Sequence, residues 1–412
     1  MSEILFLAHR VPFPPNRGDK IRSAHLLKAL LGLGPVHVGC FTETAQDVAA
    51  LDELRACAAS FCAPARRKPL AIAGLEALAL DKPVSLTAFY NRKLAAWVHQ
   101  TCAQRPISTI FVFSGQMGQY VPEDFSGRVV VDLCDVDSAK FEGYAQAGER
   151  VWLNRREGRL LAAEEERLAK RADATLLISE AEASIFKQRL SNPSQQRIEV
   201  IGNGIDASLF DPAKVSPHPD LEPSEGPHFV FTGQMDYRPN EQAALWAIDE
   251  LLPHLRQRWC GAQLHIIGRS PTAKLLDRRG TDGVTVWGEV PDVKPYLAGA
   301  HCVIAPLLIA RGVQNKVLEA MAMARPVLLT PKAATGIDAR DGEHWLVCEA
   351  DPAAMIAKVE PIVQSSAKRE TMGKAARDYV MTHHAWDAKL AKLAELIAPD
   401  KGKATLEARH AA

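Results

Sequence analysis

The 412-residue chain lacks a net charge, because Lys plus Arg and Asp plus Glu both number 49. A general nucleic-acid binder needs a basic excess to neutralise phosphates, so the balance argues against nucleic acid as a partner. One local basic pocket for a small phosphorylated ligand is still compatible with it. The sequence leaves the oligomeric state open.

The eight cysteines form no C-x-x-C pair, and no Cys/His cluster has the spacing of zinc ligands. Several lie in apolar runs, such as Cys40 in VHVGCF and Cys302 in AHCVIAP, where a buried small side chain is usual. We therefore expect reduced cysteines and a cytoplasmic protein.

Long apolar runs are missing as well. No stretch of about 20 residues is uninterruptedly apolar, so we expect no membrane span. The start, MSEILFLAHR, lacks the basic residues and apolar stretch of a signal peptide, so we expect no export signal. Peripheral association with the inner face of the cytoplasmic membrane stays open.

Short β-branched and aromatic runs alternate with amphipathic helical stretches, and this pattern occurs twice. Strands that alternate with helices predict parallel sheets covered on both faces, so we expect two doubly wound, Rossmann-like α/β domains that face a cleft. The expected strands are residues 3–8, 35–41, 108–113, 128–133, 174–179 and 197–202, then 228–233, 262–268, 283–288, 301–306, 325–330 and 343–347.

The stretch DPAKVSPHPDLEPSEGP between the two patterns is rich in proline and indicates an exposed linker. Trp386, Leu390 and Leu393 follow helical spacing with no strand after them, which predicts a helix that packs back on the first domain. The expected division is an N-terminal domain 1–205, a linker 206–226, a C-terminal domain 227–384, a helix 385–398 and a mobile tail 399–412.

The most informative segment is APLLIARGVQNKVLEAMAMARPVLLT, residues 305–330. A strand ends, a loop passes through Gly312, and a helix begins near Gln314. Lys316 beside a helix N-terminus suits a diphosphate, and Glu319 one turn later suits a ribose diol. The alternative is an exposed Lys–Glu pair on a surface helix, which is the commoner arrangement on spacing alone.

The same run resembles the donor-site signature of retaining glycosyltransferases with the GT-B fold, of the group 1, family 4 type. That signature reads Glu, seven residues, Glu-Ala-Met-Ala, then Gly-x-Pro-Val. The resemblance implies that Glu319 binds the nucleotide ribose, whereas the first Glu falls on Arg311 and the Gly on Ala324/Arg325. ARGVQNKVLEAMA is most similar to sugar transferases of PEP-CTERM/exosortase exopolysaccharide systems.

The resemblance extends over nearly the whole chain. FTGQMDYRPNEQAALW places Gly233, which has no Cβ, where backbone approaches the donor. In that segment we expect Asn240 to cap the following helix and Arg238 to contact phosphate, with an exposed turn arginine as the alternative. The backbone around Val290 is expected to meet the base.

Other residues after strands are candidates in the N-terminal half. In RVPFPPNRGDKIRSAH we expect Asp19 to cap a helix and Gly18, Arg17 and Lys20 to face the donor, although the segment is neither G-x-G-x-x-G nor a P-loop.

Ser114 and Gln116 are expected on the acceptor side of the same half. Many relatives carry a His near these two residues, and FVFSGQMGQY has none.

VVVDLCDVDSAKF allows two interpretations of its aspartates. Asp135 and Asp137 could hold Mg²⁺ or Mn²⁺, or they cap turns and helices. The GT-B resemblance implies no metal, because a helix dipole and basic side chains neutralise the leaving diphosphate. We expect Asp135 to face the acceptor hydroxyl. The mixed charges of residues 150–173 favour a solvated helix over one lying on a membrane.

The sequence thus predicts a retaining glycosyltransferase of exopolysaccharide biosynthesis, with a UDP- or GDP-linked sugar donor, a glycan or lipid-linked acceptor and no cofactor. The alternatives are a GT-B nucleotide-sugar epimerase and a non-catalytic sugar-binding protein. A nicotinamide-dependent dehydrogenase lacks support, because neither half opens with the glycine fingerprint. The expected catalytic residues are Lys316, Arg238 and Asp135, and the expected donor-binding residues are Gly18, Arg17, Gly233, Gln234, Arg269, Val290, Arg311, Gly312, Asn315, Lys316 and Glu319.

Overall fold

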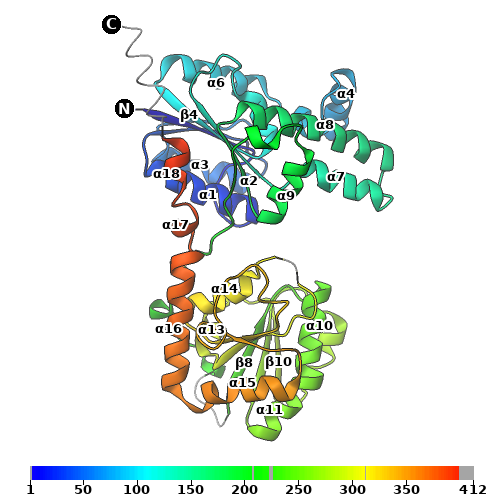
Figure 1. The fold of residues 1–412 in the computed structure, drawn as a ribbon, viewed down its shortest axis with the longest axis vertical. Helices are drawn as coiled ribbons and strands as arrows, with labels where there is room; N and C mark the ends of the chain where they lie inside the picture. Colours follow the sequence, from blue (N-terminus) through cyan, green and yellow to red (C-terminus); the bar gives the residue numbers. More distant parts are fainter. Residues whose placement is uncertain (1, 207, 222–225, 311, 399–412) are drawn as a thin grey trace. The chain divides into compact units, whose positions relative to one another are not determined.

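The computed structural model describes residues 2–206, 208–221, 226–310 and 312–398 (Figure 1). The chain forms two compact units, each of which is described by itself. The first comprises the residues up to Asn203 together with the segment from Lys389 onward, and the second comprises Gly204–Ala388.

The first unit is built on a seven-stranded sheet in the order β3-β2-β1-β4-β5-β6-β7, with every pair parallel. Phe6 of β1 lies between Val38 of β2 and Phe111 of β4 and is fully buried. Such all-apolar strands arise because helices cover both faces of a parallel sheet. The strands are β1 Glu3–Ala8, β2 Val36–Gly39, β3 Ser60–Cys62, β4 Ile107–Phe113, β5 Arg128–Cys134, β6 Ala174–Leu177 and β7 Ile198–Val200.

All six strands expected in this half are confirmed, and the structure adds the edge strand β3, whose Ser-Phe-Cys sequence contains no β-branched residue. Helices and 3₁₀ turns connect the strands. They are α1 Gly18–Leu31, α2 Ala45–Ala49, α3 Leu51–Cys57, α4 Leu70–Ala79, α5 Val84–Ala88, α6 Arg92–Gln104, η1 Gly115–Tyr120, α7 Asp137–Gln146, α8 Val151–Arg171, α9 Glu180–Arg189 and η2 Pro193–Gln195.

A buried ion pair ties the first unit together. Arg22 of α1 donates from Nε to Oδ2 of Asp132 in β5 at 2.8 Å, and from Nη1 to Oδ1 of Asn203 at 3.0 Å. Both charged side chains are almost completely buried. Asp132 is therefore a structural partner inside the strand rather than a polar residue at its end.

The C-terminal segment packs on the first unit. Thr109 of β4 donates its hydroxyl to the carbonyl of Ile397 at 3.1 Å, and Arg128 of β5 donates to the carbonyl of Leu396 at 3.1 Å. The segment differs from the single expected helix 385–398, because it contains two short helices, α17 Trp386–Lys389 and α18 Leu393–Ile397. The expected tail 399–412 lies outside the described residues.

The second unit has a six-stranded parallel sheet in the order β10-β9-β8-β11-β12-β13, and all six expected strands are confirmed. Its strands are β8 His228–Thr232, β9 Gln263–Ile267, β10 Val284–Gly288, β11 Cys302–Ala305, β12 Val327–Leu329 and β13 Leu346–Val347. Its helices are η3 Pro212–Lys214, η4 Pro219–Leu221, α10 Arg238–Trp246 continuing as η5 Ala247–Leu251 and α11 Leu252–Arg258, then α12 Ala273–Leu276, α13 Lys294–Gly299, α14 Asn315–Ala322, α15 Pro352–Gln364 and α16 Ser366–His383.

The proline-rich segment differs from the expected exposed linker 206–226. The His218 ring stacks on Tyr296 with centroids 4.5 Å apart, its backbone N–H donates to the carbonyl of Pro295 at 3.0 Å, and Leu221 is buried. A few apolar and aromatic side chains are enough to fix this stretch against α13. Its described part belongs to the second unit.

The two places where the chain passes between the units lie side by side. Ile205 bridges Ala385, with its N–H donating to the carbonyl of His384 at 2.7 Å. A Cβ on Gly204 would lie 2.6 Å from backbone atoms of Trp386, so only glycine allows this approach. Within the described part of the chain, no helix is both long and apolar enough to cross a membrane.

Candidate functional site

A pocket of about 410 Å³ opens at the carboxyl edge of the second unit's sheet. Its walls are the loops after three neighbouring strands, β8, β9 and β10, and the first turns of α14. Ligands of open α/β sheets bind at this edge. The lining residues are Thr232, Gly233, Gln234, Asn240, Ile267, Gly268, Arg269, Glu289, Val290, Val293, Val313, Asn315, Lys316 and Glu319.

Two glycines let the pocket walls come together. A Cβ on Gly268 would lie 1.6 Å from the carbonyl oxygen of Gly233, so the ends of β8 and β9 are in backbone contact. A Cβ on Gly233 would lie 2.8 Å from Nδ2 of Asn240 and 3.0 Å from Nζ of Lys316. Gly268 therefore shapes the backbone of the pocket, whereas Gly233 leaves space for two polar side chains.

These contacts predict different effects for two alanine substitutions. Gly268→Ala should destabilise the second unit and abolish ligand binding, because the new Cβ would meet the backbone carbonyl of Gly233. Both glycines have a positive φ, +158° at Gly233 and +152° at Gly268, so that backbone strain is common to the two variants. Gly233→Ala should weaken binding with a smaller loss of stability, because side-chain ends can move. Thermal melts with and without ligand separate the two cases, and an equal loss of melting temperature in both variants would contradict the distinction.

Lys316 is held over the pocket floor. Its ammonium group donates to Oδ1 of Asn240 and lies 4.7 Å from the ring centroid of Phe231. Burial lowers the pKa of Lys316 to about 8, against a smaller opposing effect of Glu319. The charge therefore lacks an ion-pair partner strong enough to offset its desolvation, which suits a site that receives an anion.

Asn240 does not cap a helix, contrary to expectation. It lies inside α10, and its Nδ2 donates to the carbonyl of Gln234 at 2.9 Å while Oδ1 accepts from Lys316. The helix begins at Arg238, three residues earlier than the capping pattern implied, because Pro239 fits the first turn. Asn240 is thus the link that positions Lys316.

Glu319 lies one turn after Lys316 on α14, and both side chains are half-buried in the pocket wall. Burial raises the pKa of Glu319, and the nearby Lys316 charge opposes the shift. Lys316 and Glu319 are therefore not the exposed pair on a surface helix that was the alternative expectation. The first backbone N–H groups of α14, from Asn315 onward, point toward the N-terminal end of the helix, where an anion is stabilised.

The structure brings together most of the predicted residues of the second unit. Gln234 accepts two hydrogen bonds from Arg269, at 3.2 and 2.6 Å, and Val290 lines the pocket beside them. Arg238 is exposed at the start of α10, and the pocket lining includes neither Arg238 nor Gly312.

The predicted residue Arg311 lies outside the described residues.

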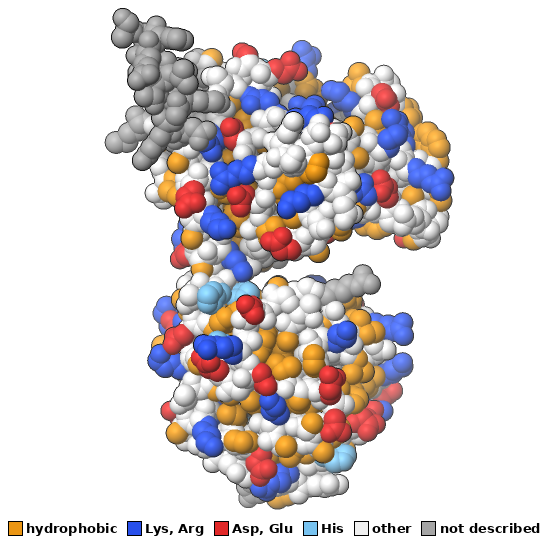
Figure 2. All heavy atoms as spheres, in the orientation of Figure 1, with side chains coloured by type: hydrophobic (Ala, Val, Ile, Leu, Met, Phe, Trp, Pro, Cys, Tyr) orange, Lys and Arg blue, Asp and Glu red, His pale blue; other side chains and the backbone are white. Residues whose placement is uncertain are grey.

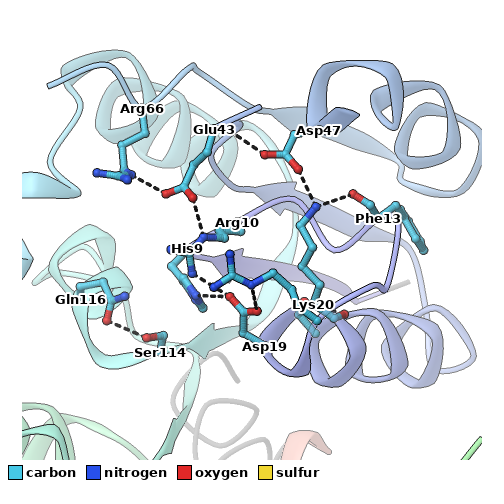
Figure 3. A network of polar contacts seen from close by, with 12 residues as sticks. His9, Arg10, Phe13, Asp19, Lys20, Glu43, Asp47, Arg66, Ser114 and Gln116 are labelled. Atoms are coloured by element: carbon cyan, nitrogen blue, oxygen red, sulfur yellow. Dashed lines mark hydrogen bonds and ion pairs between the residues drawn. The ribbon is translucent and has the colours of Figure 1, made fainter. Parts of the chain in front are cut away.

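A polar network occupies the carboxyl edge of the first unit's sheet (Figure 3). Asp19 accepts from Arg10 at 2.7 Å, pairs with Arg17 at 2.7 Å and lies 3.1 Å from Nε2 of His9. Burial alone would raise the pKa of Asp19, but these hydrogen bonds and charges lower it well below its usual value. Asp19 is therefore not the expected helix cap, because α1 begins at Gly18 and the carboxylate serves the network.

The other half of the network links the loops after β2 and β3. Glu43 accepts from Arg10 at 2.7 Å and also from Arg66, while Lys20 donates to buried Asp47 and to the carbonyl of Phe13 at 3.0 Å (Figure 3). The ammonium group of Lys20 is thus used in structural contacts with Asp47 and the Phe13 carbonyl. A Cβ on Gly18 would meet nothing within 4 Å, so the space before it is open.

His9 is the residue that the sequence analysis missed. It directly follows β1, is buried, and stacks on Phe113 at the end of β4 with centroids 5.5 Å apart. Its Nδ1 has no hydrogen-bond partner within the described residues. The position just after a strand was the signal that could have identified it.

The remaining first-unit candidates lie at the same edge. Ser114 donates to Gln116 at 2.6 Å (Figure 3). Asp135 is exposed after β5, and Asp137 begins α7, where burial raises its pKa against the nearby charge of Lys140.

A larger pocket of about 910 Å³ lies elsewhere in the first unit, among α6, η1 and α8. Its lining combines Lys82, His99 and Arg167 with four carboxylates, and Arg167 already pairs with Glu164 at 2.7 Å. An excess of acidic groups disfavours a diphosphate. The smaller pocket beside Lys316 is therefore the better nucleotide site.

Residues 226–365, which include every residue that lines this smaller pocket, match the family model described as glycosyl transferases group 1. This segment is thus similar to the group 1 glycosyltransferases. No curated protein sequence matches the chain.

Solved structures are similar in fold over both units. Sucrose-phosphate synthase from Thermosynechococcus elongatus is 18% identical with a TM-score of 0.56, and the match covers 100% of both chains. A glycosyltransferase from Rickettsia africae is 13% identical with a TM-score of 0.63, over 96% of this chain and 97% of that one. Anabaena HepE, solved in complex with UDP and glucose, is 15% identical with a TM-score of 0.58, over 96% and 99%. The predicted GT-B class, with two parallel-sheet α/β domains, is confirmed.

Proposed function

We propose that the protein transfers a sugar from a nucleoside-diphosphate sugar to an acceptor hydroxyl, with retention of configuration. The observation that carries this proposal is the pocket of the second unit, where Lys316, Glu319 and the start of α14 converge. HepE binds UDP, which favours a uridine donor here over a guanosine one.

Each end of the pocket has a chemical role in the proposal. Lys316 and the N-terminus of α14 stabilise the charge that develops on the leaving diphosphate. Glu319 accepts hydrogen bonds from the ribose hydroxyls, and the backbone near Val290 meets the base. Because the protein supplies this positive charge itself, transfer needs no metal ion and should continue in a chelator.

Retention follows in the proposal from attack by the acceptor hydroxyl on the same face from which the diphosphate leaves. In that step the acceptor oxygen forms a bond to the anomeric carbon while the bond between that carbon and the leaving phosphate oxygen breaks. The proton of the acceptor hydroxyl passes to the leaving phosphate oxygen. No glycosyl–enzyme adduct forms. A sugar adduct on the protein, seen by mass spectrometry after mixing with donor, would contradict this route.

The acceptor is proposed to be a glycan or a lipid-linked glycan of exopolysaccharide biosynthesis, reached at the inner face of the cytoplasmic membrane. In the first unit, His9, Asp135 and Gln116 all lie at the carboxyl edge of the sheet, and they are the candidates for acceptor contacts. Incubation with membrane extracts and radiolabelled donor tests this assignment, since label should enter a lipid-extractable product.

The donor site is tested by thermal shift against UDP, GDP and their sugars. Glu319→Ala should abolish most of the nucleotide-induced stabilisation, because the ribose loses its acceptor. Glu370→Ala, at an exposed position of α16, is the matched control and should respond as wild type. The site assignment fails if no nucleotide stabilises the protein or if Glu319→Ala responds like the control.

A nucleotide-sugar epimerase is the second candidate, because it would use the same nucleotide pocket, which Glu289 also lines. An epimerase converts donor alone, whereas a transferase requires acceptor for a new glycosidic bond. Product analysis after incubation with donor alone separates the two activities.

Nucleotide binding should weaken as pH rises. The pKa of Lys316 is lowered to about 8 in the free protein, so the ammonium form is lost above that pH. A bound diphosphate favours the charged form, so binding above pH 8 takes up a proton and affinity should fall by up to about tenfold per pH unit. Calorimetric titration with UDP between pH 7 and 10 measures this slope. Lys316→Arg should show a flatter profile, since arginine stays charged; equal profiles would contradict the assignment.

A further inference from the structure

Helix α4 presents its large apolar side chains to solvent. Leu70, Leu75 and Leu80 at and beside this helix are 68%, 69% and 61% exposed, and Ile72 and Leu78 are also exposed. A helix at the surface of a soluble protein normally buries such residues. Ile72, Leu75 and Leu78, spaced three residues apart, share the side of α4 opposite the buried alanines and form an exposed apolar face of a kind that marks an interaction surface.

The orientation of α4 is fixed by polar contacts and by small residues. Only Ala73 and Ala77 of the helix are buried. Thr87 donates its hydroxyl to the carbonyl of Ala73 at 2.8 Å, and Lys68 donates to Glu76 at 2.7 Å. The side of α4 that carries Ala73 and Ala77 therefore packs against the protein, and the leucines are left exposed to solvent.

The neighbouring helix α8 adds an aromatic side chain. Arg156 donates to the carbonyl of Ala77 at 2.8 Å and pairs with Asp81 at 3.2 Å. Trp152 lies one turn before Arg156 on the same side of α8 and is 67% exposed. Most of α8 is packed through Leu160 and Leu168, so only its first turn joins this face.

Basic residues surround the apolar face. Residues 66–82 contain four basic and two acidic side chains, and residues 150–159 contain four arginines and one glutamate, Glu157, which is buried. Together the two stretches carry eight basic and three acidic side chains, and three of the basic ones, Arg66, Lys68 and Arg156, pair with carboxylates. Figure 2 shows Lys and Arg side chains beside hydrophobic ones over the region where Figure 1 labels α4 and α8.

We propose that α4 and the first turn of α8 form a docking surface for an anionic phospholipid bilayer. Apolar side chains of a surface helix enter the headgroup boundary, Trp152 suits that interface, and the basic rim is attracted to anionic lipid. A symmetric dimer through the same face would instead bring two positive rims together, which is unfavourable. The inference deepens the proposed membrane location and does not depend on nucleotide binding.

Vesicle flotation tests the docking surface. The wild-type protein should float with vesicles of equimolar phosphatidylglycerol and phosphatidylcholine, much less with phosphatidylcholine alone, and less at high salt. The double substitution Leu75→Glu/Leu78→Glu should lower the partition coefficient by at least about tenfold, because two apolar anchors are lost and two negative charges are added. Leu33→Glu, at an exposed leucine elsewhere in the same unit, should bind as wild type.

Three outcomes would overturn this proposal: no binding to anionic vesicles, equal binding to both vesicle types, or unchanged binding of Leu75→Glu/Leu78→Glu. A lipid-free dimer in analytical ultracentrifugation that the same double substitution dissociates would also overturn it, in favour of a protein interface. The double variant should keep the wild-type thermal shift with UDP. Failure of the nucleotide site and failure of the docking surface are thereby distinguished.

Discussion

Replacing Lys316 by alanine should lower kcat/KM by about 10²–10³, with any donor that the protein accepts. The reason is that Lys316 supplies a side-chain cation in the first turn of α14, where we place the leaving diphosphate. Single-turnover measurements with excess enzyme should show the loss in the transfer step itself rather than in donor binding alone. Asn240→Ala should produce a smaller loss of the same kind, because it releases Lys316 without removing the charge.

Lys368→Ala is the matched control, since this lysine is exposed on α16 of the same unit and should leave the rate unchanged. Circular dichroism melts show whether each variant is folded. Lys316→Arg should recover part of the rate, because it restores the charge with a different shape. A Lys316→Ala variant that is folded and transfers at the wild-type rate would place the leaving group elsewhere.

Breaking the buried Arg22–Asp132 pair should destabilise the first unit by about 3–5 kcal/mol. Asp132→Ala leaves the guanidinium of Arg22 buried, with only Asn203 as a hydrogen-bond partner among the contacts described above. For a unit of this size the loss corresponds to a fall in melting temperature of about 6–20 °C. Differential scanning calorimetry should show the shift in the transition of the first unit.

The comparison is Arg167→Ala, which removes an exposed ion pair with Glu164 from α8. An exposed pair of this kind contributes at most about 1 kcal/mol, so the melting temperature should change by a few degrees or less. Similar shifts for Asp132→Ala and Arg167→Ala would show that burial does not set the strength of the Arg22–Asp132 pair. The double variant Arg22→Met/Asp132→Leu should lose less stability than Asp132→Ala, because no charge stays buried.

The strands and the pocket beside Lys316 could be predicted from the sequence, because both depend on local patterns. Buried parallel strands are short, apolar and bounded by polar turns, and only the edge strand β3, which has no β-branched residue, lacked that signal. The pocket residues Gly233, Val290 and Glu319 each lie after a strand or in the first turns of a helix, so strand ends alone bring them to one edge of the sheet.

Contacts between segments that are far apart in the sequence could not be predicted from it. Asn240 and Lys316 are 76 positions apart, so no local pattern shows that one positions the other. The sequence analysis assigned Asp19 to a helix cap, whereas Arg10 and His9 bind it from the preceding strand end. In both cases a side chain that fits a local role is used for a tertiary contact.

The exposed face of α4 was missed for a different reason. A leucine- and alanine-rich stretch between prolines indicates a helix, but its pattern does not tell which side is buried. Ala73 and Ala77 take the buried positions because Thr87 and Arg156 bind the carbonyl groups of these two residues. Composition alone favours the opposite orientation.

The return of the chain end to the first unit makes the second unit an insertion. Residues 204–388 are continuous in sequence and contain every residue that lines the pocket beside Lys316, so they can be expressed as one polypeptide. The first unit is split, since α18 completes it through Thr109 and Arg128. A stop codon after residue 388 would therefore remove a part of the first unit and leave the second unit complete. To isolate the first unit, a short peptide would have to join Asn203 to Lys389.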